Sequence, residues 1–239
     1  YEISRGLVGS EMCIRDSCNV LPAPAIYAST ANDECKTQNT DEANKILDAA
    51  GWARGSDGVR AKNGVRISIL YQTSTNSVRQ ATQAFIKEMW KQIGVETELR
   101  NINASVFFGG DPASPDTYGK FLTDIEMYTN NFSGTDPEAY MNNWTCAEMS
   151  GKHNNWLGNN VPRYCDPAYD ALAKEMSTAG ALEDRTRLAK AMNDMLMQNY
   201  IMIPLIHRGG VAAHANSLGG VAMNAWDTEV FNIADWYRK

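Results

Sequence analysis

The stretch from residue 65 to residue 99 constrains the fold of this chain more than any other. Apolar residues alternate over 65–71, which is typical of a strand with one buried face. A helix is predicted over 77–93, and Gly94 ends it; its apolar stripe consists of Val78, Ala81, Phe85, Met89 and Ile93. A second strand follows through Val95, Thr97 and Leu99. A strand, a helix and a strand in this order predict parallel pairing and an α/β fold.

Weaker patterns surround this unit. A helix is predicted from Asn39 to about residue 50, where Gly51 stops it, with an inward face of Ala43, Ile46, Leu47 and Ala50. A short strand over 124–128 and a short helix over 138–144 follow. Longer helices are predicted from 167 and over 183–200, and an edge strand over 201–206, which Pro204 interrupts.

Composition excludes several classes of function. The 239 residues carry a formal net charge of -6 and no cluster of Lys or Arg, which argues against nucleic acid as a partner. No segment approaches the roughly 20 apolar residues of a membrane span, so a soluble protein is expected. The sequence contains no GxSxG, HExxH, P-loop or strand-linked GxGxxG motif, and we expect neither an enzyme nor a cofactor nor a metal. Of three histidines, His207 follows an apolar run and is a candidate to line a cleft.

The cysteines leave two interpretations open. Cys18 and Cys35 bound one polar, turn-rich stretch, and Cys146 and Cys165 bound another. Such loops are typical of two local disulfides and an oxidising compartment, whereas the alternative is four unrelated buried thiols. None of the cysteines has zinc-ligand spacing.

The first residues differ in character from the rest. The stretch 9–17, GSEMCIRDS, has the look of a translated sequencing adapter, so residues 1–17, with Cys13, are predicted to be non-native. No basic region followed by an apolar stretch is present, and no signal peptide is therefore seen. We interpret the chain as a truncated piece of a longer protein.

Several segments together resemble one known family. The runs DEANKILDAAGW (41–52), SDGVRAKNG, VRISILY and SVRQATQAFIKEMWKQIGVETELR are similar to the family 5 extracellular solute-binding proteins, the peptide, oligopeptide and nickel receptors of ABC importers. TDPEAYMNNWTC, NNVPRYCDPAYDAL and MNDMLMQNYIMIPLIHRG follow in family order, so that the resemblance covers 18–239.

The resemblance implies a two-lobed, type II-like periplasmic binding fold that closes on its ligand. Residues 18–208 would form the C-terminal ligand-binding lobe, and 209–239 would return to the missing N-terminal lobe. Such proteins are periplasmic, are monomers when full length, bind small peptides between the lobes and deliver them to a membrane permease. Dipeptide-type members carry a cysteine pair where Cys146 and Cys165 stand.

The resemblance also implies a place for the ligand. Amino-peptide receptors of the family supply an aromatic residue and, three positions on, an aspartate for the ligand's α-amino group. Here Tyr128 takes the aromatic place, but Asn131 stands where the aspartate would be. Either Asp136 takes over or the amine matters less. The candidate ligand-binding residues are Tyr128, Asn130, Asn131, Phe132, Asp136 and His207.

Three alternatives remain from the sequence. The first is the same receptor class for a nickel complex, an oligosaccharide or haem. The second is a secreted hydrolase, which turnover on esters or peptides would reveal. The third is a disulfide-stabilised interaction module without a small ligand.

Overall fold

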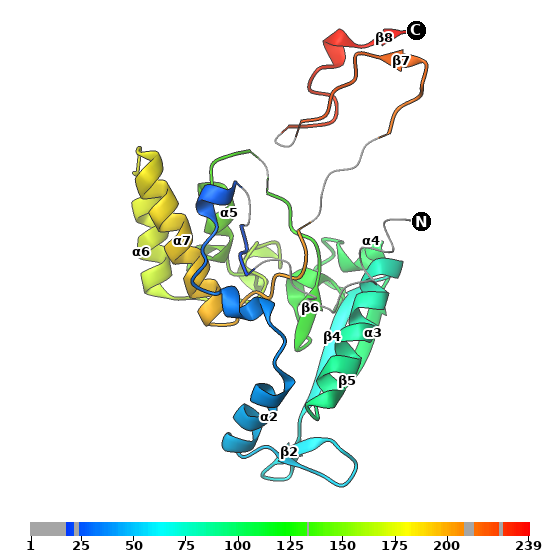
Figure 1. Ribbon diagram of the computed structural model, residues 1–239, viewed down its shortest axis with the longest axis vertical. Coiled ribbons are helices and arrows are strands. Elements are labelled where there is room, and N and C mark those ends of the chain that lie inside the picture. Colours follow the sequence, from blue (N-terminus) through cyan, green and yellow to red (C-terminus); the bar gives the residue numbers. More distant parts are fainter. Residues whose placement is uncertain (1–17, 22–23, 133, 208–212, 225–226) are drawn as a thin grey trace. The chain divides into compact units, whose positions relative to one another are not determined.

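The computed structural model describes residues 18–21, 24–132, 134–207, 213–224 and 227–239 (Figure 1). The chain forms two compact units. The first takes the described residues within 18–36, 131–142 and 171–239, and the second takes 37–130 and 143–170. The expected non-native segment 1–17 lies outside the described residues.

A parallel three-stranded sheet forms the centre of the second unit. Its order is β5 (Glu96–Ile102), β4 (Ser68–Ser74) and β6 (Ile125–Met127). Helix α3 (Ser77–Gln92) joins β4 to β5 and lies along both strands (Figure 1). The strand, helix and parallel strand expected from the sequence are therefore confirmed.

Two side-chain patterns differ from the sequence prediction because the buried faces are polar. The expected strand over 65–71 is divided into β3 (Val65–Arg66) and β4, and burial in β4 is continuous from Tyr71 to Ser74. A central strand of a parallel sheet is covered on both faces, so period-two alternation is lost. On α3 the buried residues are Gln83 and Ile86, whereas Val78 is 57% exposed. Gln83 can be buried because its Nε2 donates to Tyr71 O at 2.8 Å.

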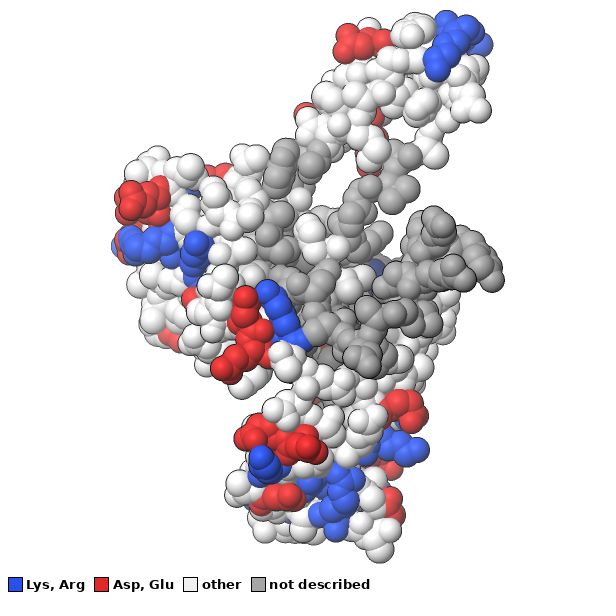
Figure 2. Space-filling model, viewed as in Figure 1, with Lys and Arg blue, Asp and Glu red and all other residues white. Residues whose placement is uncertain are grey.

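The amino end of β4 is closed by an antiparallel sheet and helix α2 (Thr40–Ala49). The sheet consists of β1 (Ala53–Arg54), β2 (Arg60–Lys62) and β3. The expected inward face of α2 is wrong, because α2 has no buried residue and Ile46 is 60% exposed. Polar contacts hold the helix instead, and acidic and basic side chains lie side by side around α2 and β2 (Figure 2).

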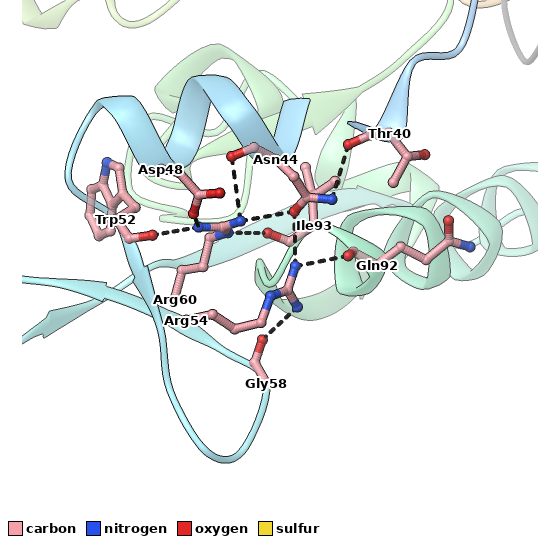
Figure 3. A network of polar contacts seen from close by, with 9 residues as sticks. All are labelled: Thr40, Asn44, Asp48, Trp52, Arg54, Gly58, Arg60, Gln92 and Ile93. Carbon is pink, nitrogen blue, oxygen red and sulfur yellow. Dashed lines mark hydrogen bonds and ion pairs between the residues drawn. The ribbon is translucent and has the colours of Figure 1, made fainter. Parts of the chain in front are cut away.

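Arg60 is the centre of these polar contacts (Figure 3). Its Nε donates to Ile93 O, its Nη1 to Asp48 Oδ1 and Trp52 O, and its Nη2 to Asn44 Oδ1, at 2.5–2.9 Å. The side chain is 2% exposed. An arginine has only N–H donors. The oxygen acceptors around its guanidinium group therefore offset the free-energy cost of burying the charge.

The remaining helices include a core-forming pair in the first unit. Helix α7 (Leu182–Gln198), which was predicted over 183–200, buries Leu188, Met192 and Leu196 and packs against α5 (Glu138–Met141). The chain also forms α4 (Ala104–Phe107), which was not predicted, α6 (Pro167–Met176), and a small antiparallel pair of β7 (Leu218–Gly219) and β8 (Tyr237–Arg238). Short 3₁₀ helices occur at Ala25–Tyr27, Asp33–Lys36, Tyr118–Lys120, Asn142–Trp144, Cys146–Glu148, Lys152–Asn154 and Ile233–Asp235.

The edge strand expected over 201–206 is wrong. Residues 201–207 have no strand structure, and Ile203 and Ile206 are exposed. Pro204 lacks an N–H donor, which weakens any ladder that this segment could join.

Both expected disulfides are present, and the alternative of four separate thiols is wrong. Cys18 bonds to Cys35 in the first unit, and Cys146 bonds to Cys165 in the second. The second bond closes a loop that is also tied by hydrogen bonds: Ser150 Oγ donates to Gly119 O at 2.7 Å. The loop is therefore anchored near Tyr118.

Candidate functional site

The carboxyl ends of β4, β5 and β6 lie at the same edge of the sheet, because the three strands are parallel. In open α/β sheets, ligands bind outside such ends. Helix α3 begins immediately after β4, and the side chain of Asn76 accepts hydrogen bonds from the backbone N–H groups of Val78 and Arg79. This cap fixes the first turn of α3, and with it Arg79, at the carboxyl edge.

Arg79 places a positive charge between the ends of two strands. Its Nη1 donates to Ser74 Oγ at 2.5 Å, and its Nη2 donates to Thr129 Oγ1 at 3.2 Å. The guanidinium carbon lies 5.2 Å from the centre of the Phe108 ring, within the range of a cation–π interaction. The side chain is half-buried and therefore remains accessible from solvent.

Aromatic rings continue from Phe108 along the same edge. The Phe108 ring lies 5.7 Å from that of Tyr118, and Tyr118 lies 5.4 Å from Tyr128. Beneath them Phe107 is fully buried, whereas Phe108 is 44% exposed. We call Ser74, Arg79, Phe108, Tyr118, Tyr128 and Thr129 the carboxyl-edge cluster. Rings beside one guanidinium suit a ligand with apolar parts and a carboxylate.

The predicted site residues divide between the two units. Tyr128 belongs to the carboxyl-edge cluster, and Asn130, which is exposed, follows it in the second unit. Asn131, Phe132, Asp136 and His207 belong to the first unit, where all but the half-buried Phe132 are exposed. The Phe132 ring meets that of Tyr140 edge-on, at 5.6 Å.

Asp136 is engaged by an arginine of its own chain. Arg185 Nη2 donates to Asp136 Oδ1 at 2.5 Å and to Glu138 Oε2 at 2.8 Å. Burial disfavours the charge of Asp136, but hydrogen bonds from Arg185 and from Glu138 N outweigh it and hold the pKa of Asp136 below its usual value. An open hollow of about 450 Å³ lies here, lined by Gly134, Thr135, Asp136, Glu138, Ala139 and Asn142. A ligand amine at Asp136 would compete with Arg185.

Sequence reasoning missed Arg79 and Phe108. Arg79 lies in the first turn of α3, outside its apolar stripe, and Phe108 caps the carboxyl end of α4, a helix that was not predicted. One signal could have found Arg79: a cation in the first turn of a helix that directly follows a parallel strand is placed at the ligand edge of the sheet. Among the described residues, no group of three His, Cys, Asp or Glu side chains could hold a metal ion.

The sequence of the chain matches the model of a known family. The family model described as "Bacterial extracellular solute-binding proteins, family 5 Middle" matches residues 16–152, more than half of the chain. The chain belongs to this family. Family 5 proteins are solute-binding proteins and not enzymes, so the expectation of a non-enzymatic protein is confirmed and the secreted-hydrolase alternative is set aside.

Individual relatives agree with this assignment. The oligopeptide-binding protein OppA of Lactococcus lactis subsp. cremoris (strain SK11) is 35% identical over 78 residues, which are 31% of this chain and 13% of OppA. NikZ from Campylobacter jejuni, solved with Ni(L-His), superposes with a TM-score of 0.67 at 19% identity, over 85% of this chain and 40% of NikZ.

A peptide receptor has the same fold. AppA from Bacillus subtilis, solved with a nonapeptide, superposes with a TM-score of 0.60 at 16% identity, over 85% of this chain and 38% of AppA. At these identities the solved structures show the fold alone, which is that of a family 5 periplasmic binding protein. The chain spans less than half the length of each relative. No helix in the described part of the chain is long and apolar enough to cross a membrane.

Proposed function

We propose that this chain is part of an extracytoplasmic receptor of an ABC importer, that it binds a small peptide and that it passes the peptide to a membrane permease. The observation that carries the peptide assignment is the carboxyl-edge cluster. Arg79 offers a fork of N–H donors that matches a carboxylate, and Phe108, Tyr118 and Tyr128 offer rings for side chains. The relative OppA is an oligopeptide-binding protein, which favours the same ligand class.

The proposal includes a division of the chain. Residues 18–208 serve as the C-terminal ligand-binding lobe of the receptor, and 209–239 return to a second lobe. The full-length receptor is proposed to be a periplasmic monomer. Family 5 is a family of extracellular solute-binding proteins, which supports this location.

The ligand's amino end is held less strongly than its carboxylate in this proposal. Asn131 provides an amide where a carboxylate would bind an ammonium with charge assistance, and Asp136 already pairs with Arg185. A blocked amine should therefore reduce affinity little. Phe132 and His207 are proposed as further ligand contacts, together with Asn130.

The test compares three forms of one tripeptide by thermal shift on the full-length receptor: free, N-acetylated and C-amidated. A ligand at 100 times its dissociation constant stabilises the folded state by about 2.7 kcal/mol, which gives a readable shift. We expect the free and acetylated peptides to shift the melt and the amidated peptide to lose most of the effect. Arg79→Gln should remove the difference between free and amidated peptide. An undiminished response to the amidated form would contradict the role of Arg79.

A nickel complex is the second candidate, because NikZ superposes on most of this chain. The described residues lack a three-ligand metal cluster, so nickel would have to arrive already chelated. A shift with nickel and histidine together, but not with peptides, would favour this ligand class.

A further inference from the structure

Strand β6 carries a half-buried glutamate, Glu126, that no ligand-binding role accounts for. Glu126 lies in β6, directly opposite Gln72 of β4 in the parallel ladder. Gln72 Nε2 donates to Glu126 Oε1 at 2.9 Å, and Gln72 is 1% exposed. The acid and the amide thus form one cross-strand pair inside the sheet.

Each member of this pair has one oxygen without a partner. Gln72 Oε1 and Glu126 Oε2 are both buried and make no hydrogen bond among the described residues. A buried acceptor that is left unpaired costs about 1–3 kcal/mol. Two acceptors cannot satisfy each other, but a single proton on the carboxyl would turn one of them into a donor.

We propose that Glu126 keeps its proton and donates it to Gln72 Oε1, so that the two side chains form a neutral pair with two hydrogen bonds that positions the end of β6. This inference rests on the proposed function, because the end of β6 leads into the carboxyl-edge cluster. Glu126 and Gln72 are positioning residues and do not contact the ligand themselves.

The surroundings of Glu126 favour the proton. Burial raises the pKa of Glu126 to about 8. The polar side chains of Gln72 and Thr123 and the positive charge of Arg163 act in the other direction and lower the pKa by less. Arg163 is the charged group that acts on Glu126, and its guanidinium is already engaged with Ser150 O and Lys120 O. On the neighbouring strand, burial raises the pKa of Tyr71, which therefore also stays neutral.

Because β6 is short, the pair of Glu126 and Gln72 has a large effect on the position of the end of this strand. β6 has three residues, and beside the ladder pairing it is joined to β4 by the bonds from Thr73 Oγ1 to Met127 O at 2.6 Å and from Tyr71 Oη to Met127 Sδ at 3.3 Å. Tyr128 and Thr129 follow at once, and Thr129 accepts from Arg79. Loss of the proton would place a charge between the strands and loosen these residues, so ligand binding is coupled to the protonation of Glu126.

The matched variants are Glu126→Gln, which keeps two hydrogen bonds as an amide–amide pair, and the swap Gln72→Glu with Glu126→Gln, which restores an acid–amide pair. In the infrared spectrum at neutral pH, when other carboxyls are ionised, we expect a protonated-acid C=O band in the wild type. The band should be absent in Glu126→Gln and present in the swap. The wild-type spectrum alone, followed from about pH 6 to about pH 10, tests the proton if a variant fails to fold. A band already missing at neutral pH overturns the proposal.

The binding arm uses trialanine with the full-length receptor. If only the protonated form binds, affinity should fall about tenfold one pH unit above the pKa of Glu126, and Glu126→Gln should abolish this fall. The same pH profile in both proteins overturns the coupling. An acid band without trialanine binding supports the pair and counts against the peptide assignment alone, which separates the two proposals.

Discussion

An arginine lies near each end of strand β4, Arg60 of β2 at the amino end and Arg79 of α3 at the carboxyl end, and the two have different surroundings. Near the amino end, Arg60 is 2% exposed and its head meets four oxygen acceptors, one of them the carboxylate of Asp48. Near the carboxyl end, Arg79 is half-buried and donates to the neutral hydroxyls of Ser74 and Thr129. A carboxylate accepts more strongly than a hydroxyl, so a ligand carboxylate would displace the bonds to Ser74 and Thr129 more readily than the bond between Arg60 and Asp48. One arginine is buried in the fold, and the other is half-buried at the edge of the sheet where we propose that the ligand binds.

The largest effect that would test this comparison is the loss of Arg60. Arg60→Met should lower the free energy of unfolding by about 3–5 kcal/mol, because the carbonyls of Trp52 and Ile93 and the carboxylate of Asp48 lose their donor. Denaturant unfolding of the full-length protein measures the loss. Asp48→Asn is the control and should cost less, because Asp48 is 64% exposed and can be hydrated. Equal losses in both variants would contradict the central role of Arg60.

A second test concerns the pH dependence of stability that Glu126 causes beside the carboxyl end of β4. The pKa of Glu126 is about 8 in the folded protein and lower in the unfolded chain, so the folded state binds more protons between the two values. The contribution of the protonated Glu126 to the free energy of unfolding is complete below the pKa that Glu126 has in the unfolded chain. This contribution is lost as pH rises through about 8. The loss should amount to no more than about 5 kcal/mol.

Unfolding free energies of the wild type and Glu126→Gln, measured at several pH values, isolate this contribution. The difference between the two proteins should change steadily over the window from the unfolded to the folded pKa. Asp136 contributes with the opposite sign, since its depressed pKa makes stability fall as pH falls, but it is common to both proteins and cancels. A constant difference would mean that Glu126 is charged in the folded state at neutral pH.

The disulfides offer a third test, because they close loops of similar length in different units. The bonded cysteines are 17 residues apart for Cys18–Cys35 and 19 for Cys146–Cys165. Replacing either pair by serine should cost about 3 kcal/mol in the chain-entropy model. Only loss of Cys146–Cys165 should also weaken peptide binding, because its loop contacts Gly119 beside Tyr118. Equal effects of the two replacements on binding would contradict the inference that the Cys146–Cys165 loop supports the ligand site.

The sequence predicted those parts of the fold that apolar patterns and chain spacing determine. The helix over Ser77–Gln92, the parallel strands on either side of it and the two cysteine pairs are confirmed. The buried faces were wrong where polar groups are satisfied inside, as with Gln83 and the run from Tyr71 to Ser74. Periodicity assigns polar residues to solvent, and a single sequence does not reveal which of them finds a partner.

The candidate site shows the same limit. Tyr128 was identified because it matches a family pattern, and it lies in the carboxyl-edge cluster. Arg79 belongs to α3, and Phe108 follows α4. The two side chains come into contact only because α3 crosses from β4 to β5 and the chain then turns into α4. Asp136 looked available in the sequence, whereas its partner Arg185 lies far along the chain. Contacts between distant residues decide which charges remain accessible.

The smallest predicted effect uses two matched helix caps. Asn39 caps α2 by accepting from Glu42 N at 2.9 Å, and Asn76 caps α3 by accepting from Val78 N and Arg79 N, both at 3.1 Å. Substituting either residue by alanine should cost about 1 kcal/mol of stability. Only Asn76→Ala should also reduce affinity for a tripeptide with a free carboxylate, because the Asn76 cap fixes the turn that carries Arg79. Isothermal titration of the two variants, with unfolding measured in parallel, makes the comparison. If both variants bind as the wild type does, the geometry of the first turn of α3 does not limit binding, and Arg79 reaches the ligand from a flexible position.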